Sequence, residues 1–99
     1  MYCYVWNYLV RPEYVQEFRA AYGPDGDWVE LFRRDPEYLR TSLLADCDDP
    51  CRFMTIDYWT TREACEYFRE RYSKEFAALD QRCGQCTTAE THIGDFTVA

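Results

Sequence analysis

The chain has 99 residues, of which 47% are hydrophobic and 18% aromatic, with a formal net charge of −7; this composition excludes a disordered chain, and the length suits one domain over residues 1–99. The 11 basic residues are scattered among 18 acidic ones, which argues against nucleic acid as a partner. No apolar run approaches the roughly 20 residues that a membrane span needs, so we expect no membrane partner.

The first predicted element is a strand over residues 2–10, YCYVWNYLV, because the segment is rich in aromatic and β-branched residues. Both of its faces are apolar, since Tyr2, Tyr4, Trp6 and Tyr8 alternate with Cys3, Val5 and Leu9. Such a strand is expected to be buried on both sides. The segment has neither the basic start nor the small-residue cleavage site of a signal peptide, so we expect a cytoplasmic location.

A helix is predicted next, because Val15, Phe18 and Tyr22 recur at helical spacing. Pro12 suits the first turn of this helix, and Gly23 lies where the helix is expected to end. The helix therefore presents one apolar side to the core.

The polar stretch YGPDGDW (22–28) is predicted to be the turn between two helices. Asp27 is expected to be the N-cap of a short second helix, with Glu30 completing a capping box. Trp28 and Phe32 share one face of this helix, which Pro36 follows and stops. The short helix is thus expected to cover the core as an amphipathic lid.

Two further strands are predicted over residues 38–47 and 52–59, joined by a hairpin turn at CDDPC. Thr60 and Glu63 form a capping box for a third helix. A helical pattern then continues to Gly84, and the tail is expected to be a fourth strand. The order β-α-α-β-β-α-α-β predicts an α+β fold, a ferredoxin-like split βαβ with an extra short helix and a four-stranded antiparallel sheet.

The chain contains six cysteines, two of which form the motif Cys83-Gly-Gln-Cys86. In a protein without an export signal we expect them to be thiols. A zinc site needs about four ligands, and no second C-x-x-C or histidine pair is present. A thioredoxin-like motif opens a helix after a strand, whereas this one follows a helical pattern. We therefore expect no metal site and no redox role for this motif.

Three segments carry a family resemblance: GPDGDWVELF (23–32), YLRTSLLAD (38–46) and FMTIDYWTTREA (53–64). Together with the first strand they resemble the antibiotic biosynthesis monooxygenase family over nearly the whole chain. The resemblance implies a dimeric α+β barrel, in which two four-stranded sheets face each other. It also implies an oxygenase that commonly uses no metal, flavin or other cofactor and oxidises electron-rich aromatic or quinol-like substrates.

The resemblance further implies two site residues. The haem-degrading branch of the superfamily uses an Asn, a Trp and a His, and Asn7 and Trp59 match the first two. The segment in which a haem-ligating histidine would lie reads YSKEFAALD (72–80), so haem degradation is not expected. By the family geometry, the strand face with Asn7 points toward the helices. Asn7 then either satisfies neighbouring backbone groups or holds a ligand, and Trp59 either packs in the core or donates to a substrate oxygen.

Two residues are candidate proton acceptors. Asp57 lies in an apolar strand, where a buried carboxylate needs a partner such as Arg40 or Arg52, or else has an altered pKa. His92 is the one histidine, and it is either a general base or an exposed strand residue. The expected walls of the pocket are the aromatic side chains of Trp28, Phe32 and Tyr72.

We therefore expect a cofactor-independent monooxygenase acting on a small aromatic, quinol-like or polyketide-like substrate. The alternative is a non-catalytic homodimer of the same fold that binds a small ligand or has a stress-related role. In both cases the homodimer is expected to form through the row of Tyr2, Tyr4, Trp6 and Tyr8. This row would otherwise be a larger exposed apolar patch than a monomer usually tolerates.

Overall fold

A computed structural model describes all 99 residues of the chain. Its elements are β1 (Tyr2–Val10), a 3₁₀ turn (Pro12–Tyr14), α1 (Val15–Tyr22), α2 (Asp27–Phe32), β2 (Tyr38–Ala45), β3 (Arg52–Trp59), α3 (Arg62–Arg71), α4 (Ser73–Cys83), a second 3₁₀ turn (Gly84–Cys86) and β4 (Thr87–Thr97). The strands form one antiparallel sheet in the order β2-β3-β1-β4. The predicted α+β fold and element order are confirmed.

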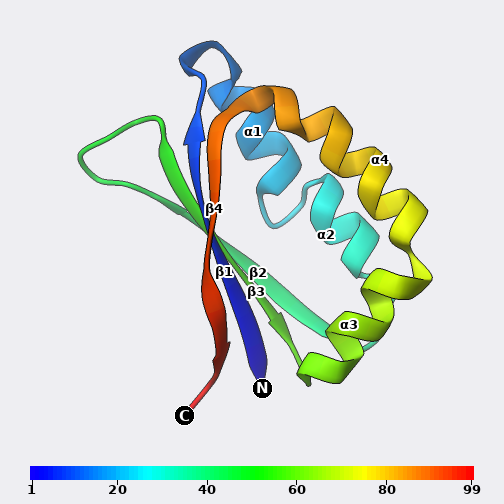
Figure 1. Cartoon of the computed structure of the whole chain (residues 1–99). Helices are drawn as coiled ribbons and strands as arrows, with labels where there is room; N and C mark the ends of the chain where they lie inside the picture. The colour runs from blue at the N-terminus through cyan, green and yellow to red at the C-terminus, as the bar shows by residue number, and fades with distance from the viewer.

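All four helices cover the same face of the sheet, and the other face is open (Figure 1). The β2–β3 hairpin projects beyond the helical layer, and the two chain ends lie near each other at the opposite end of the sheet (Figure 1). None of these helices has the length and apolar character needed to cross a membrane.

The register of the sheet shows which face of β1 meets the helices. Tyr4 lies opposite Asp57 and Tyr8 lies opposite Phe53, and side chains opposite each other share a face. Tyr4 and Tyr8 are each only 6% exposed and belong to the core beneath the helices. The aromatic row of β1 therefore packs against the helices, so the prediction that it forms a dimer interface was wrong.

The aromatic row of β1 faces the helices because large side chains are needed to fill the space between the sheet and the helical layer. The largest fully buried side chains are Phe18 of α1, Phe53 and Trp59 of β3, and Phe68 of α3. Phe18 packs against Tyr8 and Phe53, with centroids 5.2 Å and 5.1 Å away, and Trp59 packs against Phe68 at 5.1 Å. Aromatic pairs at such distances contribute about 0.5–1.5 kcal/mol each beyond the area that they bury. A row of large rings on β1 completes this layer, which Cys3 and Val5 on the other face would leave unfilled.

Two predicted helix caps lie one residue away from their expected places. Gly26, not Asp27, precedes α2, because a side chain there would come within 2.4 Å of the Ala20 and Ala21 carbonyl oxygens. Thr61, not Thr60, caps α3, and its hydroxyl accepts a hydrogen bond from the Ala64 amide at 3.1 Å. The predicted helices themselves are present.

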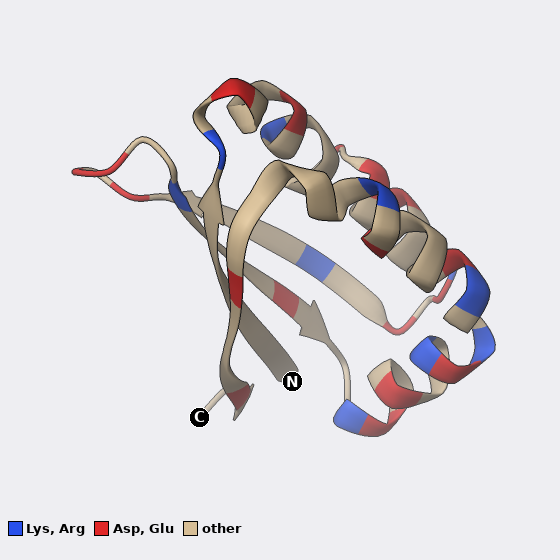
Figure 2. Ribbon diagram, turned by 45° about the horizontal axis from the view of Figure 1, so that its top comes forward, with Lys and Arg blue, Asp and Glu red and all other residues tan.

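The open face of the sheet is mainly apolar, and one half-buried polar side chain on it has an oxygen atom without a hydrogen-bond partner. Leu9, Leu44 and Phe96 are 39%, 46% and 48% exposed. Asn7 lies opposite Met54 and Thr91 on this same face, and its side-chain oxygen is buried without a hydrogen bond. Most charged residues lie on the helices and on the β2–β3 loop (Figure 2), while Arg40 and Arg52 lie on this face, paired with Tyr58 and Leu9.

Candidate active site

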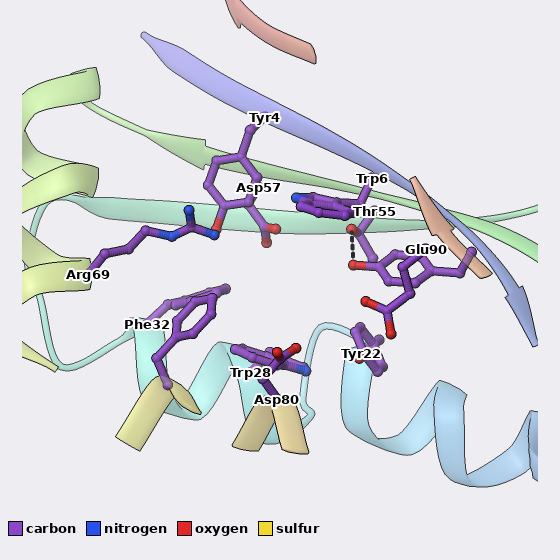
Figure 3. Close-up of a pocket in the computed structure, with 12 residues that line it drawn as sticks. Tyr4, Trp6, Tyr22, Trp28, Phe32, Thr55, Asp57, Arg69, Asp80 and Glu90 are labelled. Atoms are coloured by element: carbon purple, nitrogen blue, oxygen red, sulfur yellow. Dashed lines mark hydrogen bonds between the residues drawn. The ribbon is translucent and has the colours of Figure 1, made fainter. Parts of the chain in front are cut away.

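A cavity of about 170 Å³ lies between the sheet and the helices (Figure 3). Side chains from α2, α3 and α4 line it, together with the last residue of α1. The lining residues are Tyr4, Trp6, Tyr8, Tyr22, Trp28, Phe32, Thr55, Asp57, Arg69, Phe76, Asp80 and Glu90. Its walls are thus mainly aromatic, with a small number of polar and charged groups, as is usual for a ligand site.

Asp57 is the buried acid of this cavity. Residues 53, 55, 57 and 59 of β3 alternate toward the helices, so the strand carries Asp57 inward beside Thr55. The carboxylate is 6% exposed and accepts a hydrogen bond from the Thr41 hydroxyl on β2. Burial raises the pKa of Asp57 to about 6, against the opposing effects of the Thr41 hydrogen bond and the Arg69 charge. A carboxylate with such a pKa can exchange a proton near neutral pH.

The phenols of Tyr8 and Tyr22 supply hydroxyl groups to the same cavity. Thr55 donates a hydrogen bond to the Tyr8 hydroxyl at 3.3 Å, which leaves the Tyr8 O–H proton free to donate. Burial raises the pKa of Tyr8 and of Tyr22 above its usual range. Both phenols therefore stay protonated at neutral pH and can stabilise negative charge on a bound molecule.

The mouth of the cavity carries three exposed charged residues, namely Arg69 of α3, Asp80 of α4 and Glu90 of β4. The Arg69 guanidinium lies over the rings of Tyr4 and Phe76, 5.5 Å and 4.8 Å from their centroids. Figure 3 shows Arg69 at one end of the cavity, Glu90 at the other end, and Asp80 beside Trp28 between them. The entrance therefore carries a positive charge at the Arg69 end and a negative charge at the Glu90 end.

Trp28 forms the wall beside Asp80, and its indole N–H is unpaired. Its ring packs against Tyr22 and Phe76, with centroids 6.0 Å and 4.9 Å away. The side chain is only 8% exposed, and its Nε1 has no hydrogen-bond partner. The indole N–H lies toward the Tyr22 hydroxyl and the Cys83 thiol, at poorer than ideal hydrogen-bond geometry. Trp28 therefore serves the cavity as an aromatic wall.

Three of the predicted site residues lie together in the cavity: Asp57, Trp28 and Phe32. Trp59 does not line it; the indole is fully buried behind Phe32, with ring centroids 5.8 Å apart. Tyr72 also lies outside it and packs against Phe68 at 4.9 Å. The roles of Asp57, Trp28 and Phe32 in binding and catalysis stay predictions.

His92 lies beside the cavity and does not enter it. Its ring packs on Trp6 at 5.2 Å, and its Nε2 lies 3.3 Å from Oδ1 of Asp95. Tyr2 donates to that same Asp95 oxygen at 2.7 Å. His92 thus belongs to a neighbouring surface cluster, and Trp6 stands between it and the aromatic cavity.

Asn7 lies on the open face of the sheet, away from the helices and the cavity. It pairs with Met54 across the sheet, whereas the adjacent cavity residues Trp6 and Thr55 pair with each other. The expectation that the Asn7 face points toward the helices was therefore wrong. Because alternate residues of a strand point to opposite faces, Asn7 cannot share a cavity with Trp6 and Tyr8.

Tyr4, Tyr8 and Arg69 are functional candidates that the sequence did not indicate. The two tyrosines belong to the row assigned to a dimer interface, and Arg69 is one of many charged residues on α3. Only the packing of α3 onto the sheet brings the Arg69 side chain to the cavity. The aromatic row of β1 could have predicted the role of the two tyrosines, because such a row can line a pocket as well as an interface.

The Cys83 and Cys86 thiols are buried and unpaired, and all six cysteines of the chain are free. Burial raises the pKa of Cys83 to about 11 and raises that of Cys86 as well. A raised thiol pKa lowers the thiolate fraction on which redox and nucleophilic chemistry depend. The two side chains pack in the core with Leu79.

The fold and the cavity define a class: a ferredoxin-like α+β domain with an aromatic pocket between its sheet and its helices. Solved structures of antibiotic biosynthesis monooxygenases have this fold over nearly the full length of the chain, which confirms the resemblance at the level of structure. No protein-family model matches the sequence, and no curated protein matches it either.

Three similar structures illustrate the match. A variant of SnoaB, a cofactor-independent oxygenase from Streptomyces nogalater, has a TM-score of 0.82 at 21% identity, covering 98% of this chain and 91% of its own. A Bordetella bronchiseptica protein assigned to the antibiotic biosynthesis monooxygenases has a TM-score of 0.79 at 19% identity, covering 99% of this chain and 96% of its own. A further antibiotic biosynthesis monooxygenase has a TM-score of 0.71 at 19% identity, covering 100% and 99%.

Proposed function

We propose that the protein is a cofactor-independent monooxygenase that oxidises a small phenol- or quinol-like aromatic molecule with molecular oxygen. The observation that carries this proposal is the position of Asp57, a buried carboxylate with a pKa raised to about 6 in an aromatic cavity. The fold, shared with an oxygenase that uses no cofactor, supports it.

In the proposed reaction Asp57 accepts a proton from the bound aromatic molecule, which becomes an electron-rich anion. The anion transfers electrons to dioxygen and forms a carbon–oxygen bond, giving a hydroperoxide. The hydroperoxide carbon then loses its remaining hydrogen together with the outer OH as water, so that a phenol with a ring C–H and O₂ become a quinone and H₂O. The Tyr8 and Tyr22 hydroxyls would stabilise the anion, and the aromatic walls would exclude bulk water from it.

The size of the cavity supports a small substrate. A cavity of about 150 Å³ holds a benzene molecule, and the cavity here is about 170 Å³. One ring would therefore fill the buried part, while further substituents would extend through the mouth between Arg69 and Glu90. Such dimensions favour a substrate of one or two rings over a large polyketide.

Oxygen uptake with a panel of quinols tests the proposal. We expect uptake by the wild-type protein, and a loss of roughly 10²–10⁴-fold in Asp57→Asn, which keeps the shape of the side chain and removes the base. Asp25→Asn, in an exposed loop, is the matched control and should keep full activity. Wild-type protein that consumes no oxygen with any quinol, or an Asp57→Asn variant as active as the control, would overturn the proposal.

A second candidate function is non-catalytic binding of a small aromatic ligand. It is favoured by one observation: Asn7 and Trp59, which the resemblance implies as site residues, lie outside the cavity. Saturable binding of quinols without oxygen uptake would support this alternative.

We also propose that the protein is a homodimer assembled through the open face of its sheet. Leu9, Leu44 and Phe96 expose apolar surface there, which a second copy would cover. The unpaired state of all six cysteines supports a reducing, cytoplasmic location.

A further inference from the structure

We infer that Arg69 is a catalytic residue of the proposed oxygenase: its guanidinium binds the ligand oxygen that loses a proton to Asp57, and it stabilises the resulting phenolate. This inference rests on the proposed function for its link to oxygen chemistry, and it narrows the substrate class to phenols that react as anions. It is carried by the position of Arg69, by its unused hydrogen-bond donors and by its relation to Asp57.

The Arg69 side chain is held across one end of the cavity (Figure 3). Its guanidinium carbon lies 5.5 Å from the ring centroid of Tyr4 on β1 and 4.8 Å from that of Phe76 on α4. The side chain therefore reaches from α3 to a place between a ring of the sheet and a ring of the helical layer. Contacts of a cation with aromatic rings hold its position without neutralising its charge.

Arg69 is the one basic residue that lines the cavity, and its hydrogen-bond donors are unused. Arg34, Arg62 and Arg82 each pair with a carboxylate, whereas Arg69 forms no salt bridge and no hydrogen bond with the protein. A guanidinium has five N–H donors, and hydrogen bonds from it to a charged oxygen are about twice as strong as those between neutral groups. An anionic oxygen in the cavity would therefore find its strongest donor at Arg69.

Arg69 and Asp57 act on the same part of the cavity. Tyr4, over which Arg69 lies, is the cross-strand neighbour of Asp57. Burial raises the pKa of Asp57, and the Arg69 charge is one of the effects that oppose this rise. The guanidinium thus already stabilises the negative charge of the buried carboxylate.

Proton transfer to Asp57 moves this negative charge to the ligand. The carboxylate takes the proton of the ligand O–H group and becomes neutral, while the electron pair of that bond stays on the ligand oxygen. The total charge of the cavity is unchanged, and Arg69 exchanges one anionic neighbour for another. In a mainly aromatic cavity a phenolate without a nearby cation would be costly, and a cation that is already in place lowers this cost.

The acidic residues of the mouth set the direction in which the ligand lies. Glu90 is at the end of the cavity opposite Arg69, and Asp80 lies between the two (Figure 3). Both carboxylates repel a phenolate, whereas Arg69 attracts it. The ionising oxygen is therefore directed toward the Arg69 end.

The probes 4-nitrophenol and 4-nitroanisole test the inference, because they share a ring and a nitro group and differ in whether the oxygen can ionise. The visible absorption of 4-nitrophenol changes on ionisation, so a pH titration of the bound probe under argon gives its ionisation constant. Arg69→Gln should lower this constant by about 10- to 100-fold, the effect of losing a nearby opposite charge. The affinity for 4-nitroanisole should stay the same.

Two further variants are the controls. Arg69→Lys keeps the positive charge and should retain most of the ionisation constant. Arg71→Gln removes a charge from the same helix, where the side chain lies over Tyr72 and outside the cavity, and it should match the wild type. At pH 8, Arg69→Gln should also lower oxygen uptake with hydroquinone by roughly 10²–10³-fold, as the loss of one oxyanion donor does.

Equal ionisation constants in Arg69→Gln and Arg71→Gln would overturn the inference. A loss of 4-nitroanisole affinity in Arg69→Gln as large as the loss for 4-nitrophenol would also overturn it, because Arg69 would then act through packing alone.

Failure of this inference can be told apart from failure of the proposed function. An ionisation constant that depends on Arg69, in a protein that consumes no oxygen, would overturn the oxygenase and keep the phenolate site. Oxygen uptake with quinols at the wild-type rate in Arg69→Gln would keep the oxygenase and overturn the role of Arg69.

Discussion

The Thr41 hydroxyl on β2 donates a hydrogen bond to the Asp57 carboxylate on β3. Because its one proton is used in this way, Thr41 can only accept from the Tyr38 hydroxyl, whose oxygen lies 2.6 Å away. A chain of hydroxyl groups therefore leads from Tyr38 at the end of β2 to the buried carboxylate. The charged form of Asp57 depends on this chain.

Thr41→Val should raise the pKa of Asp57 above its value of about 6, because the Thr41 hydrogen bond lowers that pKa. The side-chain carboxyl carbon of Asp57, followed by ¹³C NMR from pH 4 to 9, measures the change directly. Thr41→Ser keeps the hydroxyl and is the control, with an expected midpoint near that of the wild type. A midpoint in Thr41→Val that equals the Thr41→Ser value would show that the hydrogen bond does not control the acid.

Asp57 should make the folded state less stable at neutral pH than at acid pH. Its folded pKa of about 6 lies above the usual 3.8, so the folded state binds more protons between these values and loses stability as the pH rises through them. The groups facing it are Tyr4 from β1, Thr41 from β2 and Arg69 from α3. Asp57→Asn removes the buried charge and should stabilise the protein by about 2–3 kcal/mol above pH 6, with little effect below pH 4.

Urea denaturation of Asp57→Asn and the wild type at pH 4 and pH 8 measures this difference. Equal stabilisation at both pH values would mean that the effect comes from packing and not from ionisation. A destabilised variant at pH 8 would mean that the carboxylate is held by its partners more strongly than burial opposes it.

Trp59→Phe should reduce stability and leave the site intact. The indole is fully buried among Phe32, Tyr38 and Phe68, so the smaller ring leaves a cavity. We expect a net loss of about 1–2 kcal/mol with oxygen uptake per folded molecule changed less than twofold. A hundredfold loss of uptake at unchanged melting temperature would instead place Trp59 in contact with substrate.

Charges on the open sheet face should separate the proposed dimer. Leu44→Glu with Phe96→Glu introduces carboxylates at two exposed apolar positions of that face. Light scattering should show a dimer for the wild type and a monomer for this variant, because like charges would be buried against each other. Tyr67→Glu, at an exposed position on α3, should stay dimeric. A wild-type protein that is monomeric at micromolar concentration would remove the proposed interface.

The elements could be predicted from the sequence because their signals are local. Helical periodicity in α1 and α2, the hairpin residues between β2 and β3, and Gly84 after α4 each depend on neighbouring residues only. Asp57 and Trp28 were found in the same way, as a charge in an apolar strand and as the first ring of an amphipathic helix.

The orientation of β1 could not be predicted, because both of its faces are apolar. In a strand with one polar face, the apolar face is the one expected to be buried. In β1 either face could be buried, and the two choices differ by a shift of one residue. The choice depends on the ring-sized volume beneath the helices, which is set by Phe18, Phe32 and Phe68 together. Arg69 and Glu90 were missed for a related reason, since an exposed charge near a cavity has the same local sequence as any solvated charge.

The sheet order makes β1 and β4, the first and last strands of the chain, immediate neighbours. Glu90 reaches the mouth of the cavity from β4, while Tyr4 and Tyr8 form its floor from β1. The residues of β1 leave the ribosome before those of β4, so they must wait for β4 before the binding site exists. Until β4 pairs, β1 offers an unsatisfied strand edge and a bare row of aromatic rings. Synthesis of this chain should thus be the period when its aromatic row most needs protection from other chains.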